Sequence, residues 1–322
     1  DKNKQLIPDY FRFVRGLVDS SDLSLNISRE MLQHDRLLKK IAVSVESKIK
    51  SELEKMQKNN REQYNEFYKI YGINLKYGIY EGFGINKEKL QDLIMFKTTE
   101  STEFRTLAEY VEAMKEDQKV IYYASGKTKE AILALPQMDL LKEKEYEVLL
   151  FTDDIVEFMV NILQKYSEKE FKSINQGDLD LIDKKEDKKI TKLTKEKQAL
   201  LDVLSESLAG KVESVKLSKR LKESPVCLVS GEGLSMEMEK VLQQMPNATD
   251  AKATRILEIN PHHELFKTLE HIYETTPEKV GTYAKILYSQ ALLIEGLPLE
   301  DPAEFSKLMV ELMIAKEQKA DE

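Results

Sequence analysis

The chain has 322 residues and a mass of 37.2 kDa, enough for about two domains, and its 33% charged residues with few glycines and prolines favour long solvated helices. Its net charge of −8 argues against a general nucleic-acid-binding protein, because such proteins need an excess of Lys and Arg to contact phosphates. With one cysteine, a mean hydropathy of −0.46 and no long apolar run, we expect a cytoplasmic protein without a disulfide or a membrane span.

Residues 1–114 are expected to form a helical unit. Apolar residues at spacings of three and four predict a short amphipathic helix over 8–18 and a long one that starts near residue 28 and reaches residue 56. A third helix is predicted over about 62–70. It leads into a run rich in Tyr and Gly, residues 77–84, that ends the periodicity.

Residues 115–182 predict a small α/β unit. Two short β-branched and aromatic runs, 119–124 and 146–151, are typical of strands, and a helical stretch over 128–135 separates them. This order indicates a βαβ crossover, which requires two parallel strands. A further helix over 154–163 would cover the other face of the layer.

The rest of the chain, from residue 183, predicts an α+β domain. Residues 183–197 have almost nothing to bury and indicate either a solvated linker or the exposed start of a helix. The segments that follow are a helix over 195–208, strands over 212–217 and 226–230, and a methionine-rich helix over 234–245.

The two last predicted helices, 276–295 and 304–313, carry broad apolar surfaces. Two such helices bury each other only partly. The remaining surface could pack on its own domain or on the same pair in a second copy, forming a twofold-symmetric four-helix bundle. The residues that we assign to dimerisation are Tyr283, Leu287, Leu292, Phe305, Met309 and Leu312.

Several candidate catalytic or binding motifs are incomplete. The Gly-Lys-Thr at 126–128 lacks the earlier glycine of a phosphate loop, and the Gly-Phe-Gly at 82–84 lacks the third glycine of a dinucleotide fingerprint. The three histidines within 262–271 come with no HExxH motif and no second cysteine, so no metal site is expected. Cys227 lies in an apolar run and is expected to be a buried, inert thiol.

The segment 25–33 (LNISREMLQ) has a positive charge, Arg29, near the predicted start of a helix, where positive charges are normally unfavourable. If Ser28 is the N-cap, Arg29 falls in the first turn, where the helix dipole disfavours a cation by ~0.3–1 kcal/mol. Free backbone N–H groups, the guanidinium, Gln33 one turn on and the amide of Asn26 would together suit a phosphate oxygen. Alternatively, the arginine forms an ion pair with a carboxylate nearby in the sequence.

With its flanks included, the stretch 6–33 closely resembles the middle-domain signature of the heat-shock protein 90 family. Residues 119–123 (KVIYY), 147–153 (EVLLFTD) and 299–302 (LEDP) resemble further family segments, in the family's order and at similar spacing. The C-terminal end, 319–322, lacks an acidic docking tail, so the chain is most similar to the bacterial members of the family.

The resemblance implies a dimeric, ATP-driven chaperone built from an N-terminal nucleotide domain, a middle domain and a C-terminal dimerisation domain. This chain would then comprise a truncated middle domain, 1–182, and the dimerisation domain, 183–322, with a helix-rich α/β and α+β fold. ATP and Mg would be bound mainly by the N-terminal domain. We therefore expect no cofactor in this chain and no ATPase activity from it alone.

The resemblance also assigns roles to residues. Arg29 would reach the γ-phosphate of ATP as an arginine finger supplied in cis, with Gln33 and Asn26 beside it on the same catalytic loop. The helix over 234–245 would contact non-native client proteins, because methionine-rich surfaces adapt to varied partners. The client-binding residues assigned on this basis are Leu234, Met236, Met238 and Leu242. The alternative is an ordinary core helix in which methionine fills gaps.

A nucleotide-independent dimeric scaffold remains the competing interpretation. It would share every predicted helix and would differ at Arg29, since a scaffold has no need for a cation at that end of a helix. A free-standing enzyme is disfavoured, because the sequence contains no recognisable combination of a nucleophile and a base and no set of metal ligands. Nucleic acid and membrane are not expected as partners.

Overall fold

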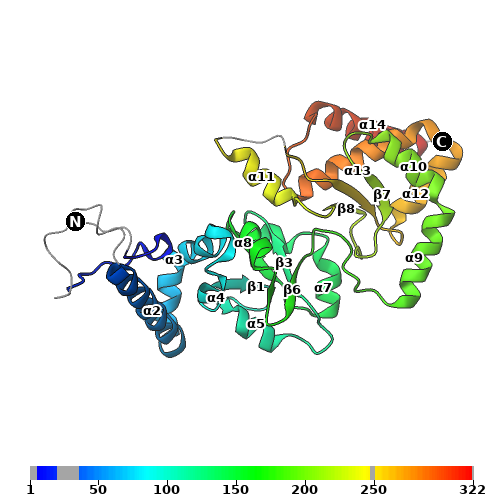
Figure 1. Ribbon diagram of the computed structural model, residues 1–322. Helices are drawn as coiled ribbons and strands as arrows, with labels where there is room; N and C mark the ends of the chain where they lie inside the picture. The colour runs from blue at the N-terminus through cyan, green and yellow to red at the C-terminus, as the bar shows by residue number, and fades with distance from the viewer. Residues whose placement is uncertain (1–5, 20–35, 247–250, 321–322) are drawn as a thin grey trace. The chain divides into compact units, whose positions relative to one another are not determined.

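The computed structural model describes residues 6–19, 36–246 and 251–320 (Figure 1). These residues form a helix-rich chain with short strands, which confirms the predicted combination of α/β and α+β architecture. Most of the predicted helices and strands are present within a few residues of their predicted bounds.

Contacts within the chain define two compact units. The first comprises Asp1–Ile121 and Leu149–Phe171, and the second comprises Tyr122–Val148 and Lys172–Glu322. The domain boundary predicted at residue 183 falls inside the second unit, so the division into a middle and a C-terminal domain stays a prediction.

Two packed helices, α2 (Arg36–Asn59) and α3 (Arg61–Tyr80), dominate the first unit. Asn60 joins them and caps α3, because its side-chain oxygen accepts a hydrogen bond from the backbone N–H of Gln63. The predicted end of this helix at residue 70 is wrong. The Tyr- and Gly-rich run that hides the periodicity is still helical, since it is apolar on two faces and buries only one of them.

The predicted helix over 8–18 is also wrong: among its residues only the 3-10 turn η1 (Asp9–Phe11) forms. Tyr10 and Phe11 are neighbours in sequence and both are buried, whereas a helix would turn them about 100° apart. The turn packs on α3 at Gly78, where an added Cβ would lie 2.6 Å from the Cβ of Tyr10.

The first unit also contains two strands that the sequence analysis did not anticipate, β1 (Met95–Thr98) and β2 (Arg105–Thr106). β1 pairs antiparallel with β2 and with β4 (Leu149–Phe151), so that Lys97 lies opposite Leu150. The other elements here are η2 (Glu81–Gly84), α4 (Lys87–Leu90), α5 (Leu107–Ala113), α8 (Val156–Leu163), β5 (Lys165–Tyr166) and β6 (Lys169–Ser173), whose last two residues belong to the second unit.

Tyrosine hydroxyls join α3 to the sheet. The Tyr64 hydroxyl donates to the Leu93 carbonyl at 2.6 Å, and the Tyr68 hydroxyl donates to the Met95 carbonyl at 2.8 Å. Both side chains are buried, and the Tyr68 ring lies over Gly72, where an added Cβ would be 2.8 Å away. Hydrogen bonds therefore fix the position of α3 along β1, in addition to apolar packing.

A buried lysine adds an ion pair to the same helix. The Lys76 ammonium lies 2.5 Å from an Asp153 carboxylate oxygen and faces the rings of Tyr68 and Phe96 at 5.8 and 5.2 Å. Burial lowers the pKa of Lys76, and Asp153 opposes that shift. Asp153 thus supplies the opposite charge that favours the ammonium form of this buried lysine.

The second unit begins with β3 (Ile121–Ser125), whose first residue belongs to the first unit. Its further elements are α6 (Lys129–Leu133), α7 (Met138–Lys144), α9 (Lys184–Glu196), α10 (Gln198–Ser207), β7 (Ser214–Leu217), β8 (Val226–Ser230), α11 (Met236–Gln244), β9 (Arg255–Ile259), α12 (Glu264–Thr275), η3 (Pro277–Lys279), α13 (Val280–Ile294) and α14 (Pro302–Ala320). The charged stretch from residue 183 is a helix rather than a linker: Asp183 caps α9, and Ile190 is buried in the core.

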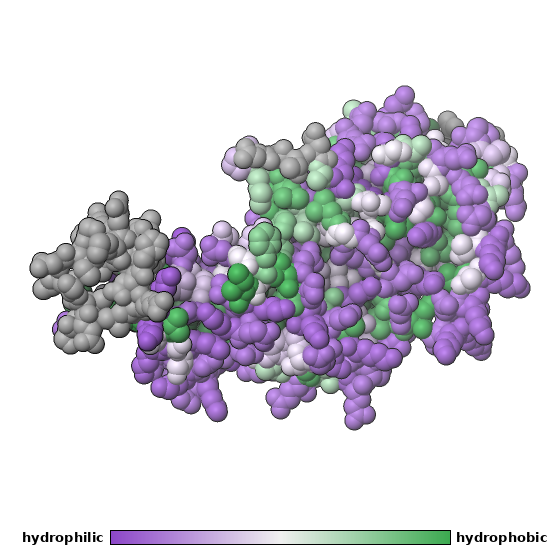
Figure 2. All heavy atoms as spheres, viewed as in Figure 1, coloured by the Kyte–Doolittle hydropathy of each residue, from purple (hydrophilic) through white to green (hydrophobic). Residues whose placement is uncertain are grey.

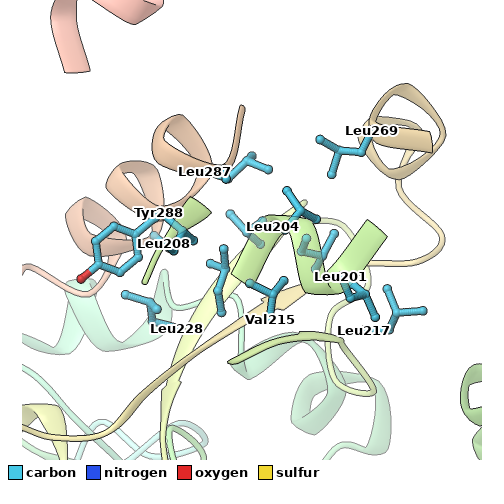
Figure 3. Close-up of a cluster of buried hydrophobic side chains, with 14 of the residues drawn as sticks. Leu201, Leu204, Leu208, Val215, Leu217, Leu228, Leu269, Leu287 and Tyr288 are labelled. Atoms are coloured by element: carbon cyan, nitrogen blue, oxygen red, sulfur yellow. The ribbon is translucent and has the colours of Figure 1, made fainter. Parts of the chain in front are cut away.

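A mixed three-stranded sheet, in the order β7–β9–β8, forms the centre of this unit. β7 runs parallel to β9, with Val215 opposite Leu257, and β8 runs antiparallel to it, with Leu228 opposite the same residue. The large core lies between the sheet and helices α10 and α13 (Figure 3). Cys227 and Val229 belong to a separate cluster, so β8 is buried on both faces, as its unbroken apolar run indicates.

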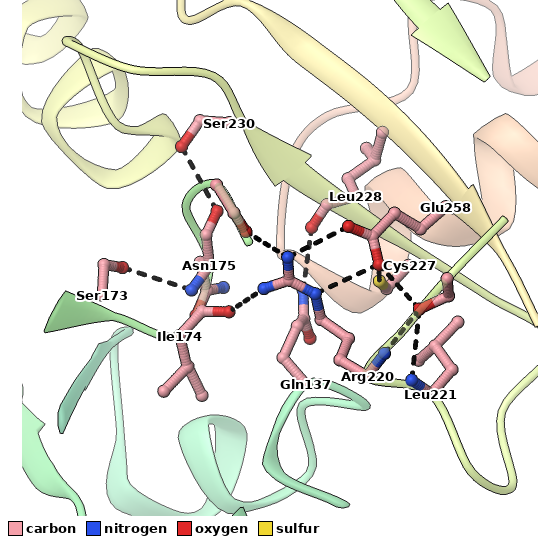
Figure 4. A network of polar contacts seen from close by, with 12 residues as sticks. Gln137, Ser173, Ile174, Asn175, Arg220, Leu221, Cys227, Leu228, Ser230 and Glu258 are labelled. Carbon is pink, nitrogen blue, oxygen red and sulfur yellow. Dashed lines mark hydrogen bonds and ion pairs between the residues drawn. The ribbon is translucent and has the colours of Figure 1, made fainter. Parts of the chain in front are cut away.

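A buried arginine attaches the segment 174–177 to this sheet (Figure 4). The Arg220 guanidinium binds both oxygens of Glu258, with Nε and Nη2 at 3.1 and 3.0 Å, and donates to the carbonyl of Ile174 at 2.8 Å and to that of Gly177. The segment also exchanges main-chain hydrogen bonds with Ser230 at the end of β8. Removing one partner of such a buried pair costs about 3–5 kcal/mol, because the other charge is left without a partner.

Glu295, directly after α13, is a second buried charge beside this segment. Its carboxylate accepts hydrogen bonds from the side-chain amides of Gln137 at 2.6 Å and Asn175 at 3.0 Å, and the Lys240 ammonium binds its main-chain oxygen at 2.7 Å. Burial raises the pKa of Glu295 to about 7, although these contacts partly offset the shift.

The raised pKa predicts a pH-dependent contribution to stability. Between about pH 4.5 and 7 the folded chain keeps a proton on Glu295 that the unfolded chain releases, so this contribution is full below pH 4.5 and is lost as pH rises through 7. We expect Glu295→Gln to gain about 3 kcal/mol relative to the wild type between pH 4.5 and 8, as measured by urea unfolding.

Glu223→Gln is the matched control, because Glu223 is an exposed glutamate in the same unit. A difference in stability between wild type and Glu295→Gln that stays constant from pH 4.5 to 8 would contradict the prediction.

Candidate functional site

Helix α11 presents most of its apolar side chains away from the core. Ser235 caps it by accepting a hydrogen bond from the Met238 backbone N–H at 3.0 Å. Among the described residues of this segment, Met236 is buried in the large core, which supports the gap-filling interpretation for that residue alone. Leu234, Met238, Val241 and Leu242 are half-buried and Met245 is 46% exposed. Hydrophobic side chains gather around α11 on the face shown in Figure 2.

The inner face of α11 is polar instead. Glu239 is 2% exposed and forms an ion pair with Arg255 at 2.8 Å, and the Lys240 ammonium reaches the main chain of Glu295. A helix that folds onto a core normally buries its apolar stripe. In α11 most of that stripe lies outside the large core.

Helices α13 and α14 pack on each other, and the residues predicted for dimerisation fall into two classes. Leu287 and Leu292 are buried in the core of the unit itself, so their side chains do not form an open surface. Tyr283, Phe305, Met309 and Leu312 are half-buried. The most exposed apolar residues on these helices are Leu293 at 51%, Val310 at 50%, Met313 at 61% and Ile314 at 53%.

The sequence analysis missed an exposed apolar surface on the first unit. We call it the α3 stripe: Ile70, Ile73, Tyr77, Tyr80, Phe83 and Ile85, which are between 38 and 95% exposed. The first four recur at spacings of three and four on one face of α3, opposite its buried face. Phe83 extends the stripe from η2 with a left-handed φ of 54° and is its most exposed member. Apolar residues on both faces of one helix are the signal that could have identified it.

The three residues predicted to act on nucleotide, Asn26, Arg29 and Gln33, lie outside the described residues. Their roles stay predictions. The described chain resumes at Arg36, the first residue of α2.

Residues of the motifs that were rejected as functional sites have structural roles instead. Thr128 caps α6, Gly82 and Gly84 form a turn with positive φ, and His263 caps α12. Cys227 is buried, and burial together with the nearby Glu258 raises the pKa of its thiol well above the usual range, so it is not a nucleophile.

Neither a metal site nor a membrane span is found in the ranges that the structure describes. Over those ranges no three His, Cys, Asp or Glu side chains are grouped to hold a metal ion. No helix there combines the length and apolarity that crossing a membrane requires. The features that stand out are thus two exposed apolar surfaces and one pair of partly exposed C-terminal helices.

Comparisons with known proteins identify the family of the chain. Residues 1–322 match the family described as Hsp90 protein. Relatives named chaperone protein HtpG include those of Clostridium perfringens, 50% identical over 313 residues, Clostridium acetobutylicum, 53% over 309, and Alkaliphilus metalliredigens, 51% over 313. These alignments cover 97, 96 and 97% of this chain but 50, 49 and 50% of the relatives, so the chain spans about half their length. The chain belongs to the Hsp90 protein family and is related to bacterial chaperones.

Proposed function

We propose that this chain forms the middle and C-terminal parts of an ATP-dependent chaperone that binds non-native proteins as a dimeric clamp. Membership of the Hsp90 family and the relatives' name of chaperone support the proposal. The chain would contribute client binding, dimerisation and one catalytic arginine. ATP and Mg²⁺ would be bound mainly by the half of the relatives that this chain does not span.

The observation that carries the proposal is the orientation of α11. Leu234, Met238 and Leu242 are half-buried on a helix whose inner face is charged, so they can cover apolar segments of a partner. Methionine has three rotatable bonds and a polarisable sulfur, which suits a surface that accepts varied sequences. Non-native proteins expose such apolar segments in many forms.

The α3 stripe supports a second client-binding surface. Two of its exposed rings, Tyr77 and Tyr80, contact each other with centroids 6.1 Å apart, and Tyr80 also contacts the half-buried Phe158 of α8 at the same distance. Aromatic residues provide large contact areas at a small cost in side-chain entropy. A row of exposed aromatic and aliphatic side chains is typical of a protein interaction site.

Dimerisation would use the exposed side of α13 and α14. Val310 and Met313 recur at a spacing of three on α14, and both are at least half exposed. The buried Leu287 and Leu292 would support this surface from inside rather than contact the second copy. Two such helix pairs would form a twofold bundle in which the same residues meet across the axis.

Arg29 would act on ATP that is bound to the nucleotide domain. An arginine that approaches the γ-phosphate stabilises negative charge on the transferred group, and it adds more to the rate than to ground-state binding. Asn26 and Gln33 would orient it on the same loop.

The client surface predicts a binding defect. We expect Met238→Ser combined with Leu242→Ser to bind reduced, carboxymethylated α-lactalbumin about tenfold more weakly, since two half-buried apolar contacts are lost. Fluorescence anisotropy measures the affinity. Val43→Ser, on the exposed face of α2, is the control and should bind as the wild type does. Equal affinities for all three chains would contradict a client role for α11.

The proposed dimer surface predicts that substitutions on α14 change the mass of the assembly in solution. In sedimentation equilibrium the chain should have twice its mass of 37.2 kDa, and Val310→Glu with Met313→Glu should reduce this to the monomer value, because the charges would be buried at the interface. Val43→Glu should stay dimeric. A wild-type monomer at tens of micromolar would refute the clamp.

The arginine predicts a loss of turnover with little loss of binding. In a chimera that adds the N-terminal half of the Clostridium acetobutylicum relative, Arg29→Ala should lower kcat for ATP by roughly 10³-fold and leave the Kd for ATP nearly unchanged. Arg15→Ala is the control, since Arg15 is an exposed arginine. Wild-type turnover in Arg29→Ala would show that the assignment is wrong and would favour a nucleotide-independent scaffold.

A further inference from the structure

Helix α11 is attached to its unit through a buried carboxylate, in addition to the buried Met236 and the contact of Lys240 with the main chain of Glu295. Glu239 accepts hydrogen bonds from Arg255 at 2.8 Å, from the backbone N–H of Ala253 at 2.8 Å and from the Gln243 side chain at 3.0 Å. Its side chain is 3% exposed and that of Arg255 is 14% exposed, so the pair is shielded from water. This carboxylate thus connects the middle of α11 to the start of β9.

Arg255 extends the connection to a third element. Its second terminal nitrogen donates to the Tyr288 hydroxyl at 3.1 Å, and Tyr288 is buried in the large core as part of α13. We call Glu239, Arg255 and Tyr288 the α11 anchor. The anchor links α11, β9 and α13, so the helix is held against both the sheet and the last core helix.

The two faces of α11 show why the anchor determines its orientation. Met236 and Glu239 lie three residues apart and are buried on the inner face, whereas Met238, Leu242 and Met245 recur at spacings of three and four on another face and are half-buried or exposed. Apolar burial is non-directional and would equally favour a helix rotated to bury its methionines. Hydrogen bonds to a charged group are directional and stronger than those between neutral groups, so they can select the observed rotation.

We propose that Glu239 and Arg255 are positioning residues, which hold α11 with its apolar side chains turned outward. Breaking the pair leaves a buried charge without a partner, and detachment of the helix returns that charge to water. The inference rests on the proposed function, since it explains how a client surface is kept open on a helix that could otherwise close onto its own core.

Hydrogen exchange of the full chain tests the anchor directly. In Glu239→Gln we expect exchange across residues 234–245 to become about tenfold faster or more, while exchange in β8 stays at the wild-type rate. Glu237→Gln is the matched control: it removes the same charge from the same helix, and Glu237 contacts Lys240 of α11 rather than β9 or α13, while the contact of Lys240 with the main-chain oxygen of Glu295 does not depend on the charge of Glu237. Equal exchange across 234–245 in the two variants would overturn the proposal.

Arg255→Lys provides the same test if Glu239→Gln does not fold. Lysine keeps the charge but cannot bind Glu239 and Tyr288 with one planar group, so exchange of α11 should again rise while β8 is unchanged. Unchanged exchange of α11 in a folded Arg255→Lys chain would also overturn the proposal.

Client binding separates the positioning role from the proposed function. The affinity of Glu239→Gln for reduced, carboxymethylated α-lactalbumin should fall in proportion to the fraction of chains in which α11 remains attached, because only the attached fraction binds. Faster exchange in Glu239→Gln, with affinity unchanged in the Met238 and Leu242 variant, would confirm the anchor and contradict the client role of α11. Unchanged exchange, with binding still lost in the Met238 and Leu242 variant, would overturn the anchor and leave the client surface in place.

Discussion

The second unit depends on the buried pair of Arg220 and Glu258. A single guanidinium neutralises a carboxylate in the central strand of the sheet and also serves two main-chain carbonyls of the segment 174–177. Lysine could not replace it, because an ammonium has no planar set of donors that reaches both targets. The position of the segment 174–177 is thus fixed by the direction of these hydrogen bonds as well as by charge. Apolar packing alone provides no such direction.

The same principle holds α11 in place. Beside the buried Met236, its inner face carries hydrogen-bonded charged groups, while its outer face is apolar and half-buried. This reverses the usual arrangement of a surface helix and means that the helix does not gain its stability from the side chains that would bind a partner. The outer apolar residues of α11 can then be substituted without detaching the helix from its unit.

Most helices and strands can be predicted from local sequence patterns. Which of their apolar surfaces are buried and which are exposed cannot. The sequence predicts β8 over 226–230 because five apolar or small residues stand between Pro225 and Gly231. It misses β9, whose charged Arg255 and Glu258 find their partners far away in the chain. Periodicity shows that α13 is apolar on a broad surface but not what covers it, so Leu287 is assigned to a dimer although its own core buries it.

The glycines of α3 have a consequence for the order in which the chain folds. Gly72 and Gly78 each lower the helix propensity by about 1 kcal/mol relative to alanine, yet both are required by the close approach of Tyr68 and Tyr10. An isolated α3 is therefore a weak helix, and its stability comes from β1 and from the N-terminal turn. During synthesis, α3 can pack on the turn and on α2, which precede it, but it gains its hydrogen bonds to the carbonyls of Leu93 and Met95 only after the following segment has emerged.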